Sequence, residues 1–83
     1  MFSWFKKSMV YIVRLSMEDH STNIESFSKL EDAYAFVMEC NKNAFCEVYY
    51  PLEVLKDKAS GSYGITGFNT GEDEYYIDIM EVQ

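Results

Sequence analysis

The 83 residues of the chain correspond to one domain, and a domain of this size buries only about 60% of its unfolded surface. The net charge of −7 is unevenly distributed, because residues 1–17 contain three basic and no acidic side chains and the remainder has a net charge of −10. A free-standing nucleic-acid-binding domain normally carries a basic stripe, and the sequence has none. The acidic body therefore favours a partner protein with a basic surface, or serves solubility alone.

The composition also restricts the cellular setting. Two cysteines, Cys40 and Cys46, are too few for a disulfide framework, and we expect both to be small buried hydrophobic residues in a reducing cytoplasm. No apolar run approaches the roughly 18 residues of a membrane-spanning helix. Seven tyrosines, six phenylalanines and one tryptophan exceed what one helix and one sheet face can cover, which favours a surface for self-association or for a partner.

Residues 1–8 form an aromatic and basic appendage to a single domain that spans residues 9–83. Phe2, Trp4 and Phe5 precede two lysines, a pattern compatible with an interfacial membrane anchor. The segment is only about two helical turns long, however, and it lacks the apolar region of a signal peptide. A second interpretation is that translation starts at Met9, which would make the segment an appendage. We expect the aromatic residues to pack back onto the domain or onto a second copy.

Residues 9–17 predict a strand in the centre of a sheet, because apolar side chains alternate on one face and also begin the other face. Arg14 interrupts the second face, and we expect it to pair with an acid on a neighbouring strand. Residues 18–23 predict a polar hairpin loop, and residues 24–27 predict the returning strand. Consecutive loop residues rarely converge on one ion, and the chain has no histidine other than His20, so we predict no metal site.

A helix is predicted from Ser28 to about Asn41. Ser28 and Glu31 fit a capping box, in which Ser28 is the N-cap. The residues at helical spacing are Leu30, Ala33, Tyr34, Val37, Met38 and Asn41, with Phe36 and Cys40 widening the apolar stripe. After this helix, residues 45–50 predict a strand. Pro51 then occupies a plausible first helical position of a short turn over residues 51–56.

All four glycines fall between residues 57 and 71. The segment lacks the Gly-Lys-Ser/Thr ending of a phosphate-binding loop, and its glycine spacing differs from that of a dinucleotide-binding fingerprint. We predict either an irregular edge strand from Tyr63 to Phe68 with bulges at glycines, or a loop that orders on a partner. A turn at residues 69–71 then leads to a final strand over residues 75–82, which we place beside residues 9–17.

These elements predict an α+β fold. An antiparallel sheet of four or five strands has one main helix packed on one face, in the order β-β-α-β-(β)-β. One helix covers one face of a sheet, so the other face, with Val10, Ile12 and several aromatic residues, is left for residues 1–8 or for a second copy. A homodimer is the expectation that follows.

The sequence does not support an enzyme. A nucleophilic triad needs a Ser or Cys close to a His, whereas His20 lies in a predicted polar loop and both cysteines are predicted to be buried. Paired carboxylates need a substrate cleft, for which a small domain with one main helix has little room. We therefore predict neither catalytic activity nor a cofactor.

Two functions remain. The first is a small acidic cytoplasmic module that binds a larger protein and inhibits or modulates it, a composition typical of host-factor inhibitors encoded by phages and mobile elements. In this case we predict that the partner binds Glu72, Asp73, Glu74, Tyr75 and Tyr76. In one version of this hypothesis the partner is itself a protein that handles nucleic acid. The alternative is an oligomeric module for a small ligand or nucleotide, in which the glycine-rich segment closes over the ligand and Tyr63 or Phe68 stacks on it.

Overall fold

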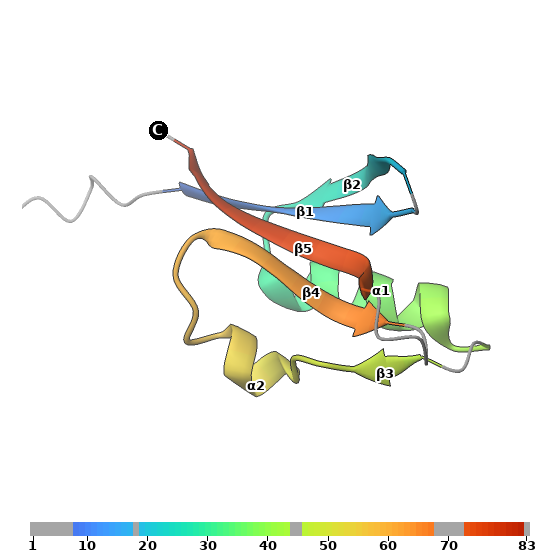
Figure 1. Cartoon of the computed structure of the whole chain (residues 1–83). Helices are drawn as coiled ribbons and strands as arrows, with labels where there is room; N and C mark the ends of the chain where they lie inside the picture. The colour runs from blue at the N-terminus through green and yellow to red at the C-terminus, as the bar shows by residue number, and fades with distance from the viewer. Residues whose placement is uncertain (1–7, 18, 44–45, 68–72, 83) are drawn as a thin grey trace, which may run out of the picture.

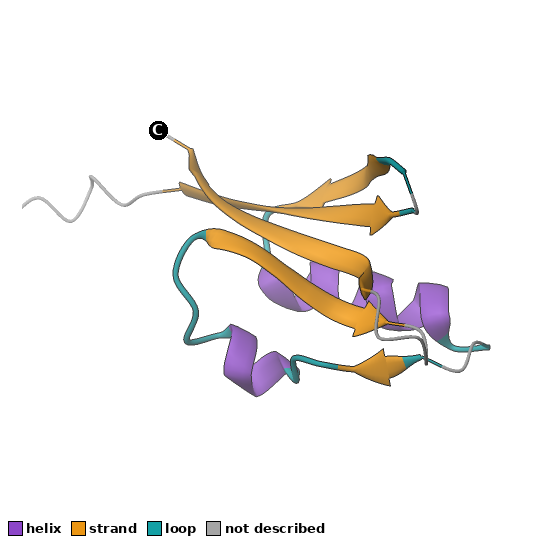
Figure 2. Cartoon of the chain, in the orientation of Figure 1, coloured by secondary structure: helices purple, strands orange, loops and turns teal. Residues whose placement is uncertain are grey.

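The computed structural model describes residues 8–17, 19–43, 46–67 and 73–82. In chain order the elements are β1 (Ser8–Ser16), β2 (Ser21–Phe27), α1 (Leu30–Asn41), β3 (Glu47–Val48), α2 (Leu52–Leu55), β4 (Gly61–Gly67) and β5 (Asp73–Val82). The strands form one five-stranded antiparallel sheet in the order β2-β1-β5-β4-β3, as Figures 1 and 2 show. The predicted α+β fold is confirmed.

β1 lies in the interior of the sheet, as its two apolar faces predicted. It pairs with β2 on one side and with β5 on the other. The predicted hairpin joins β1 to β2, but β2 begins at Ser21 and not at residue 24, so the loop is shorter than predicted. A hydrogen bond of 2.7 Å from the Met17 amide to the His20 carbonyl closes it. The final strand lies beside β1, so this long-range prediction is also confirmed.

The hydrophobic core lies between one face of the sheet and both helices. Val13 and Ile77 face each other across β1 and β5, and both are fully buried. The core consists of Val13, Leu30, Ala33, Val37, Leu55, Ile65, Ile77 and Ile79. Since α1 and α2 both contribute to this one cluster, the opposite face of the sheet has no described helix packed on it.

The start of α1 differs from the prediction. The N-cap residue is Lys29, whose backbone is extended at φ −128° and ψ 134°, and no side chain caps the helix. The amide of Ala33 donates to the carbonyl of Lys29 at 3.2 Å, so the first helical hydrogen bond begins one residue after Ser28. The predicted capping box of Ser28 and Glu31 is therefore wrong. The N-cap is the residue whose carbonyl accepts the first helical hydrogen bond, which here is Lys29. Ser28 therefore lies one residue before the N-cap position.

The prediction that both cysteines are buried is also wrong. Cys40 is exposed and Cys46 is only half-buried. In the last turn of α1 it is Asn41 that points to the sheet, where its side-chain amide donates to the Thr66 hydroxyl at 3.1 Å. Cys40, the residue before Asn41, is turned away from this contact and is exposed. The predicted stripe is therefore correct at Val37 and Asn41, and it was too wide where it included Cys40.

The segment after α1 has less regular structure than predicted. β3 contains only two residues, although the Tyr49 amide extends the contact with β4 by donating to the Ile65 carbonyl at 2.8 Å. The short helix α2 is present, but Pro51 is its N-cap and not its first helical residue. Leu55 of this helix is buried in the core. The segment thus contributes one buried apolar side chain to the core.

β4 is not an edge strand, because β3 pairs with its outer side. The predicted irregularity is present, however. Gly64 pairs with Tyr76 and Thr66 with Tyr75, which leaves Ile65 as an extra residue of β4. Gly67 then pairs with Asp73, which leaves Glu74 as an extra residue of β5. A bulge directs two successive side chains to the same face, and Ile65 and Thr66 are accordingly both buried.

Candidate functional site

The face of the sheet opposite the helices carries the candidate site. Side chains alternate along a strand, so the residues of β1 and β5 that lie between the core positions point to this face. They are Val10, Ile12 and Arg14 on β1 and Tyr76, Asp78, Met80 and Val82 on β5, and we call this surface the open face. Met80 and Val82 are 47% and 48% exposed. The open face therefore presents apolar side chains at one end and polar and aromatic ones at the other.

Arg14 and Asp78 form the polar centre of the open face. Nε and Nη2 of Arg14 donate to the two carboxylate oxygens of Asp78 at 3.0 and 3.1 Å. The guanidinium also lies over the ring of Tyr76, 4.3 Å from its centroid. The pairing of Arg14 with an acid on a neighbouring strand is thus confirmed. Sequence reasoning did not identify the stacking on Tyr76, although Tyr76 is the residue directly opposite Arg14 in the register.

The electrostatics of this centre favour the charged forms of both side chains. The hydrogen bonds to Asp78 raise the pKa of Arg14 above its ordinary value. Burial alone would raise the pKa of Asp78, but hydrogen bonds from Arg14 and Ser62, together with the charge of Arg14, outweigh it and hold the pKa below its ordinary value. The pair is therefore ionised at neutral pH and contributes no net charge to the open face.

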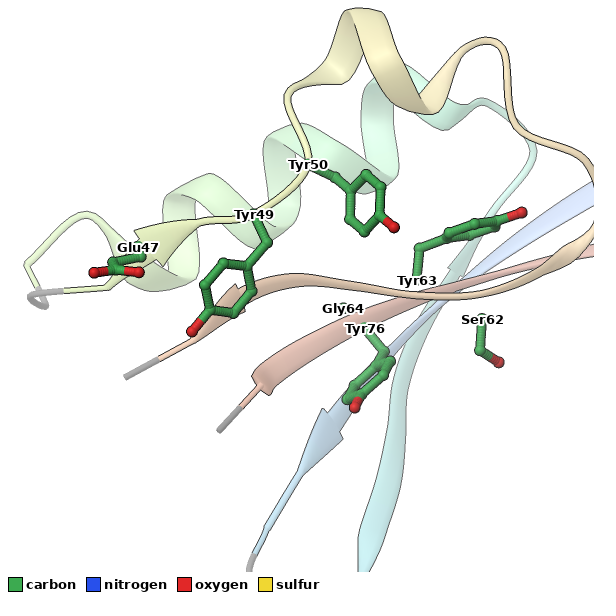
Figure 3. A pocket seen from close by; sticks show the side chains of 7 residues that line it. All are labelled: Glu47, Tyr49, Tyr50, Ser62, Tyr63, Gly64 and Tyr76. Carbon is green, nitrogen blue, oxygen red and sulfur yellow. The ribbon is translucent and has the colours of Figure 1, made fainter. Parts of the chain in front are cut away.

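A hollow open to solvent lies beside this centre, with a volume of about 630 Å³. Its lining residues, shown in Figure 3, are Glu47, Tyr49, Tyr50, Ser62, Tyr63, Gly64 and Tyr76. Gly64 lies opposite Tyr76 in the sheet and adds no side chain to the lining. Glu47 is the charged residue of the lining. We call this feature the tyrosine hollow.

Two of the tyrosines, Tyr50 and Tyr63, line the tyrosine hollow from the helix side of β4, where both pack against the core. The rings of Tyr50 and Tyr63 meet edge to face with a centroid distance of 5.7 Å. The hydroxyl of Tyr63 donates to the Ala59 carbonyl at 2.7 Å, and the hydroxyl of Tyr34 donates to the Tyr50 carbonyl at 3.0 Å. These contacts attach the segment around α2 to the rest of the domain, so this wall of the hollow is fixed by packing.

A second polar cluster lies at the end of α1, on the helix side of the sheet. The Cys46 thiol lies 3.2 Å from Oδ1 of Asn41 and 3.3 Å from Oε2 of Glu74, and it can donate to either. Burial raises the pKa of Cys46, and the hydrogen bond and charge of Glu74 raise it further. A thiol that stays protonated is a poor nucleophile, so this cluster has the properties of a structural junction.

The predicted partner-binding residues whose side chains the structure describes lie on both sides of the sheet. Tyr76 lies on the open face, whereas Tyr75 lies on the helix side, where burial and the neighbouring Cys40 and Glu74 raise its pKa. Glu74 also lies on the helix side, because the bulge turns it towards Cys46. The backbone of Asp73 begins β5, and Glu72 lies outside the described residues. A role of these residues in binding stays a prediction.

Of the two residues predicted for a small ligand, Tyr63 lines the tyrosine hollow and Phe68 lies outside the described residues. Sequence reasoning did not identify Glu47, Tyr49 or Gly64 as members of a site. The period-two pattern of residues 45–50 does place Glu47 and Tyr49 on the same face. The sequence does not contain the register that places Gly64 opposite Tyr76 and brings both into one lining with Tyr49.

The remaining chemistry-bearing side chains of the described residues are not arranged as a catalytic or metal centre. His20 is exposed, and its Nδ1 lies 2.9 Å from Oδ1 of Asp19 in the hairpin loop. Within the described ranges, no three His, Cys, Asp or Glu side chains gather closely enough to hold a metal ion. The same ranges contain no helix with the length and apolarity needed to span a membrane.

The fold and the site together define a small α+β domain with one helix-covered and one open sheet face. Comparisons with family models, curated proteins and solved structures found no match for this chain. The function is therefore inferred from the site alone.

Proposed function

We propose that this protein is a non-enzymatic protein-binding module that docks a partner with a basic surface on its open face and thereby inhibits or modulates that partner. The observation that carries the proposal is the composition of the open face. Protein interfaces combine an apolar centre with aromatic residues and arginine. The open face has Met80 and Val82 half exposed, next to Arg14 stacked on Tyr76.

The charge distribution supports a basic partner. Arg14 and Asp78 neutralise each other, which leaves Glu47 as the charged residue of the adjacent tyrosine hollow. The chain beyond residue 17 has a net charge of −10. Complementary charges steer a partner to the correct face and reject like-charged competitors. A basic partner would therefore approach faster and bind more tightly in low salt than in high salt.

The described side chains offer less support for an enzyme. A general base or nucleophile needs a partner group that orients it. The imidazole of His20 lies beside its sequence neighbour Asp19 in an exposed loop, and Cys46 is kept protonated by burial and by Glu74. The nucleotide alternative has one observation in its favour, since Tyr63 lines the hollow. However, a nucleotide phosphate would be repelled by the acidic chain.

The proposal is tested by affinity capture with two matched variants. The full chain is immobilised and exposed to cytosol of its source in low and high salt, and bound proteins are read by mass spectrometry. Met80→Glu places a charge on the open face, where Met80 is 47% exposed. Val54→Glu places the same charge on α2, where Val54 is 42% exposed. We expect one stoichiometric partner that Val54→Glu retains, that Met80→Glu loses and that high salt releases.

Two results would contradict the proposal. A partner captured equally by Met80→Glu and Val54→Glu would exclude the open face as the docking surface. Absence of any protein partner, combined with thermal stabilisation by a nucleotide, would favour the ligand-binding alternative. The triple variant Glu72/Asp73/Glu74→Ala belongs in the same assay, because it tells the predicted acidic patch apart from the open face.

A further inference from the structure

We infer that the open face is also a self-association surface, on which two copies of this chain pack face to face about a two-fold axis. The inference does not depend on the proposed function, because it concerns what covers the open face when no other protein is bound there.

Four apolar side chains of the open face lie outside the core. On β5, Met80 and Val82 are 47% and 48% exposed. On β1, Val10 is paired with Met80, and Val10 and Ile12 are half-buried. None of the four belongs to the core cluster or to the partly buried residues packed against it. Figure 2 shows α1 and α2 on the other side of the sheet, so neither described helix covers these side chains. Apolar surface of this kind gains free energy when it is covered.

The charge of the open face favours a second copy as the occupant. In a chain of net charge −7, the charged residues of this face are Arg14 and Asp78, which pair with each other. The residues paired with open-face positions on the flanking strands are small and uncharged, namely Asn23 and Ser26 on β2 and Ser62 and Gly64 on β4. Glu25 of β2 is paired with the core residue Val13 and so lies on the helix side. Two copies can therefore meet through this face without bringing unpaired carboxylates together.

The order of the strands makes the open face self-complementary. β1 and β5 are antiparallel neighbours, flanked by β2 and β4. A two-fold axis parallel to these strands and between the two copies places β1 of one copy over β5 of the other, and β2 over β4. The apolar ends then coincide, so that Val10 and Ile12 of one copy face Met80 of the other. β3, which carries Glu47, lies outside the overlap.

The area of the open face is sufficient for a reversible dimer. Strands about 4.8 Å apart and about 30 Å long, the length of the nine residues of β1, give four strands a face of roughly 600 Å². Two copies would together bury about 1,200 Å², which is the lower end of the range for specific interfaces. We therefore expect a dimer that forms and dissociates with protein concentration.

The inference is tested by sedimentation equilibrium of the full chain from micromolar to millimolar concentration. The variants Met80→Glu and Val54→Glu are measured in parallel, because they have the same net charge and place it on the open face and on α2 respectively. We expect wild type and Val54→Glu to dimerise alike. Met80→Glu should raise the dissociation constant by about tenfold or more, since each dimer would bury two unpaired carboxylates. In a mixture of labelled and unlabelled chains, isotope-filtered NOEs should connect Met80 of one copy to Ile12 of the other.

The response to salt separates this inference from the proposed function. Two copies of net charge −7 repel each other, and salt screens the repulsion, so the dimer should become tighter in high salt. Capture of a basic partner should become weaker under the same conditions.

A chain that stays monomeric at millimolar concentration in high salt would overturn the inference and leave the proposed function intact. Equal weakening of a dimer by Met80→Glu and Val54→Glu would also overturn it, because the interface would then be another surface. A monomer in which Met80 has NOEs to the aromatic rings of residues 1–7 would assign the face to that segment instead. Conversely, a dimer that responds as expected would stand even if no basic partner were captured.

Discussion

Arg14 and Asp78 are joined diagonally across the two strands β1 and β5. In the register Arg14 lies opposite Tyr76 and Asp78 lies opposite Ile12, yet the guanidinium reaches both carboxylate oxygens of Asp78 at 3.0 and 3.1 Å. The same guanidinium covers the ring of Tyr76. One side chain therefore links two successive positions of β5 on the open face, and it fixes the orientation of a ring that also lines the tyrosine hollow.

Removal of the Asp78 charge should destabilise the domain. We expect Asp78→Asn to lower the free energy of unfolding at neutral pH by about 1 to 3 kcal/mol, because it weakens charge-assisted hydrogen bonds between two side chains that are 22% and 17% exposed. The measurement is urea denaturation followed by circular dichroism. Asp19→Asn, at an exposed aspartate of the hairpin, is the control and should change stability by no more than about 0.5 kcal/mol. Equal effects of the two substitutions would contradict the prediction.

The contribution of Asp78 should also depend on pH. Because the pKa of Asp78 is lower in the folded chain than its ordinary value of 3.8, the unfolded chain takes up its proton first as the pH falls. The stabilisation is thus present above pH 3.8 and is lost as the pH falls through the lower pKa of the folded state. We expect the difference in stability between wild type and Asp78→Asn to shrink over this acidic range. A difference that stays constant would show that ionisation of Asp78 does not contribute.

A cap at the start of α1 should stabilise the domain. Lys29 occupies the N-cap position, and its side chain cannot accept a hydrogen bond from the free amides of the first turn. We expect Lys29→Ser to raise the free energy of unfolding by about 1 kcal/mol, whereas Lys29→Ala removes the same charge without adding a cap and should gain little. Thermal denaturation of both variants is the check. If Ser28 were the working cap, Lys29→Ser would not exceed Lys29→Ala.

The two adjacent residues Val54 and Leu55 should respond very differently to truncation. Leu55 is 1% exposed and belongs to the core, whereas Val54 is 42% exposed. Leu55→Ala should cost about 2 to 5 kcal/mol, the range for a buried leucine, and Val54→Ala about 0.5 kcal/mol or less. Urea denaturation of the two variants tests whether α2 is an integral part of the core. Similar small losses would mean that α2 is only loosely attached.

The two thiols should react at different rates with a thiol-specific reagent. Cys40 is exposed, while Cys46 is half-buried and has a raised pKa because of burial and of Glu74. We expect Cys40 to be labelled first at neutral pH, measured in the single-cysteine variants Cys46→Ser and Cys40→Ser. Glu74→Gln should speed the labelling of Cys46, whereas Glu53→Gln should not. Equal rates for the two thiols would contradict the placement of Cys46 beside Glu74.

The predictions from sequence were accurate where alternation alone decides the structure. The pattern of residues 9–17 placed Val13 on the buried face and Arg14 on the other, and the structure confirms both, including the acidic partner of Arg14. Pairing of the last strand with β1 is confirmed for the same reason, since a strand as apolar as residues 75–82 needs neighbours on both sides.

The predictions failed where the outcome depends on neighbours distant in sequence. Helical spacing placed both Asn41 and Cys40 on the stripe, and nothing near Cys40 in the sequence reveals that Asn41 contacts Thr66 while Cys40 is exposed. The segment of β4 was predicted to be an irregular edge strand or a loop, because the strand predicted over residues 45–50 carries no signal of which strand it pairs with. The tyrosine hollow depends on the register of three strands, which the sequence of each strand does not contain.

The paired bulges at Ile65 and Glu74 have a consequence for the opposite side of the sheet. The two bulges compensate each other, because Gly64–Tyr76 before them and Gly67–Asp73 after them follow the same register. Without the bulges, a regular ladder would place Thr66 opposite Glu74 and direct both side chains to the open face. Asn41 and Cys46 hold Thr66 and Glu74 on the helix side instead. In an Asn41→Ala, Cys46→Ala variant, a change of cross-strand NOEs from Thr66–Tyr75 to Ile65–Tyr75 would reveal the alternative ladder. Asn41 and Cys46, on the helix side of the sheet, thereby keep the Glu74 carboxylate away from the open face.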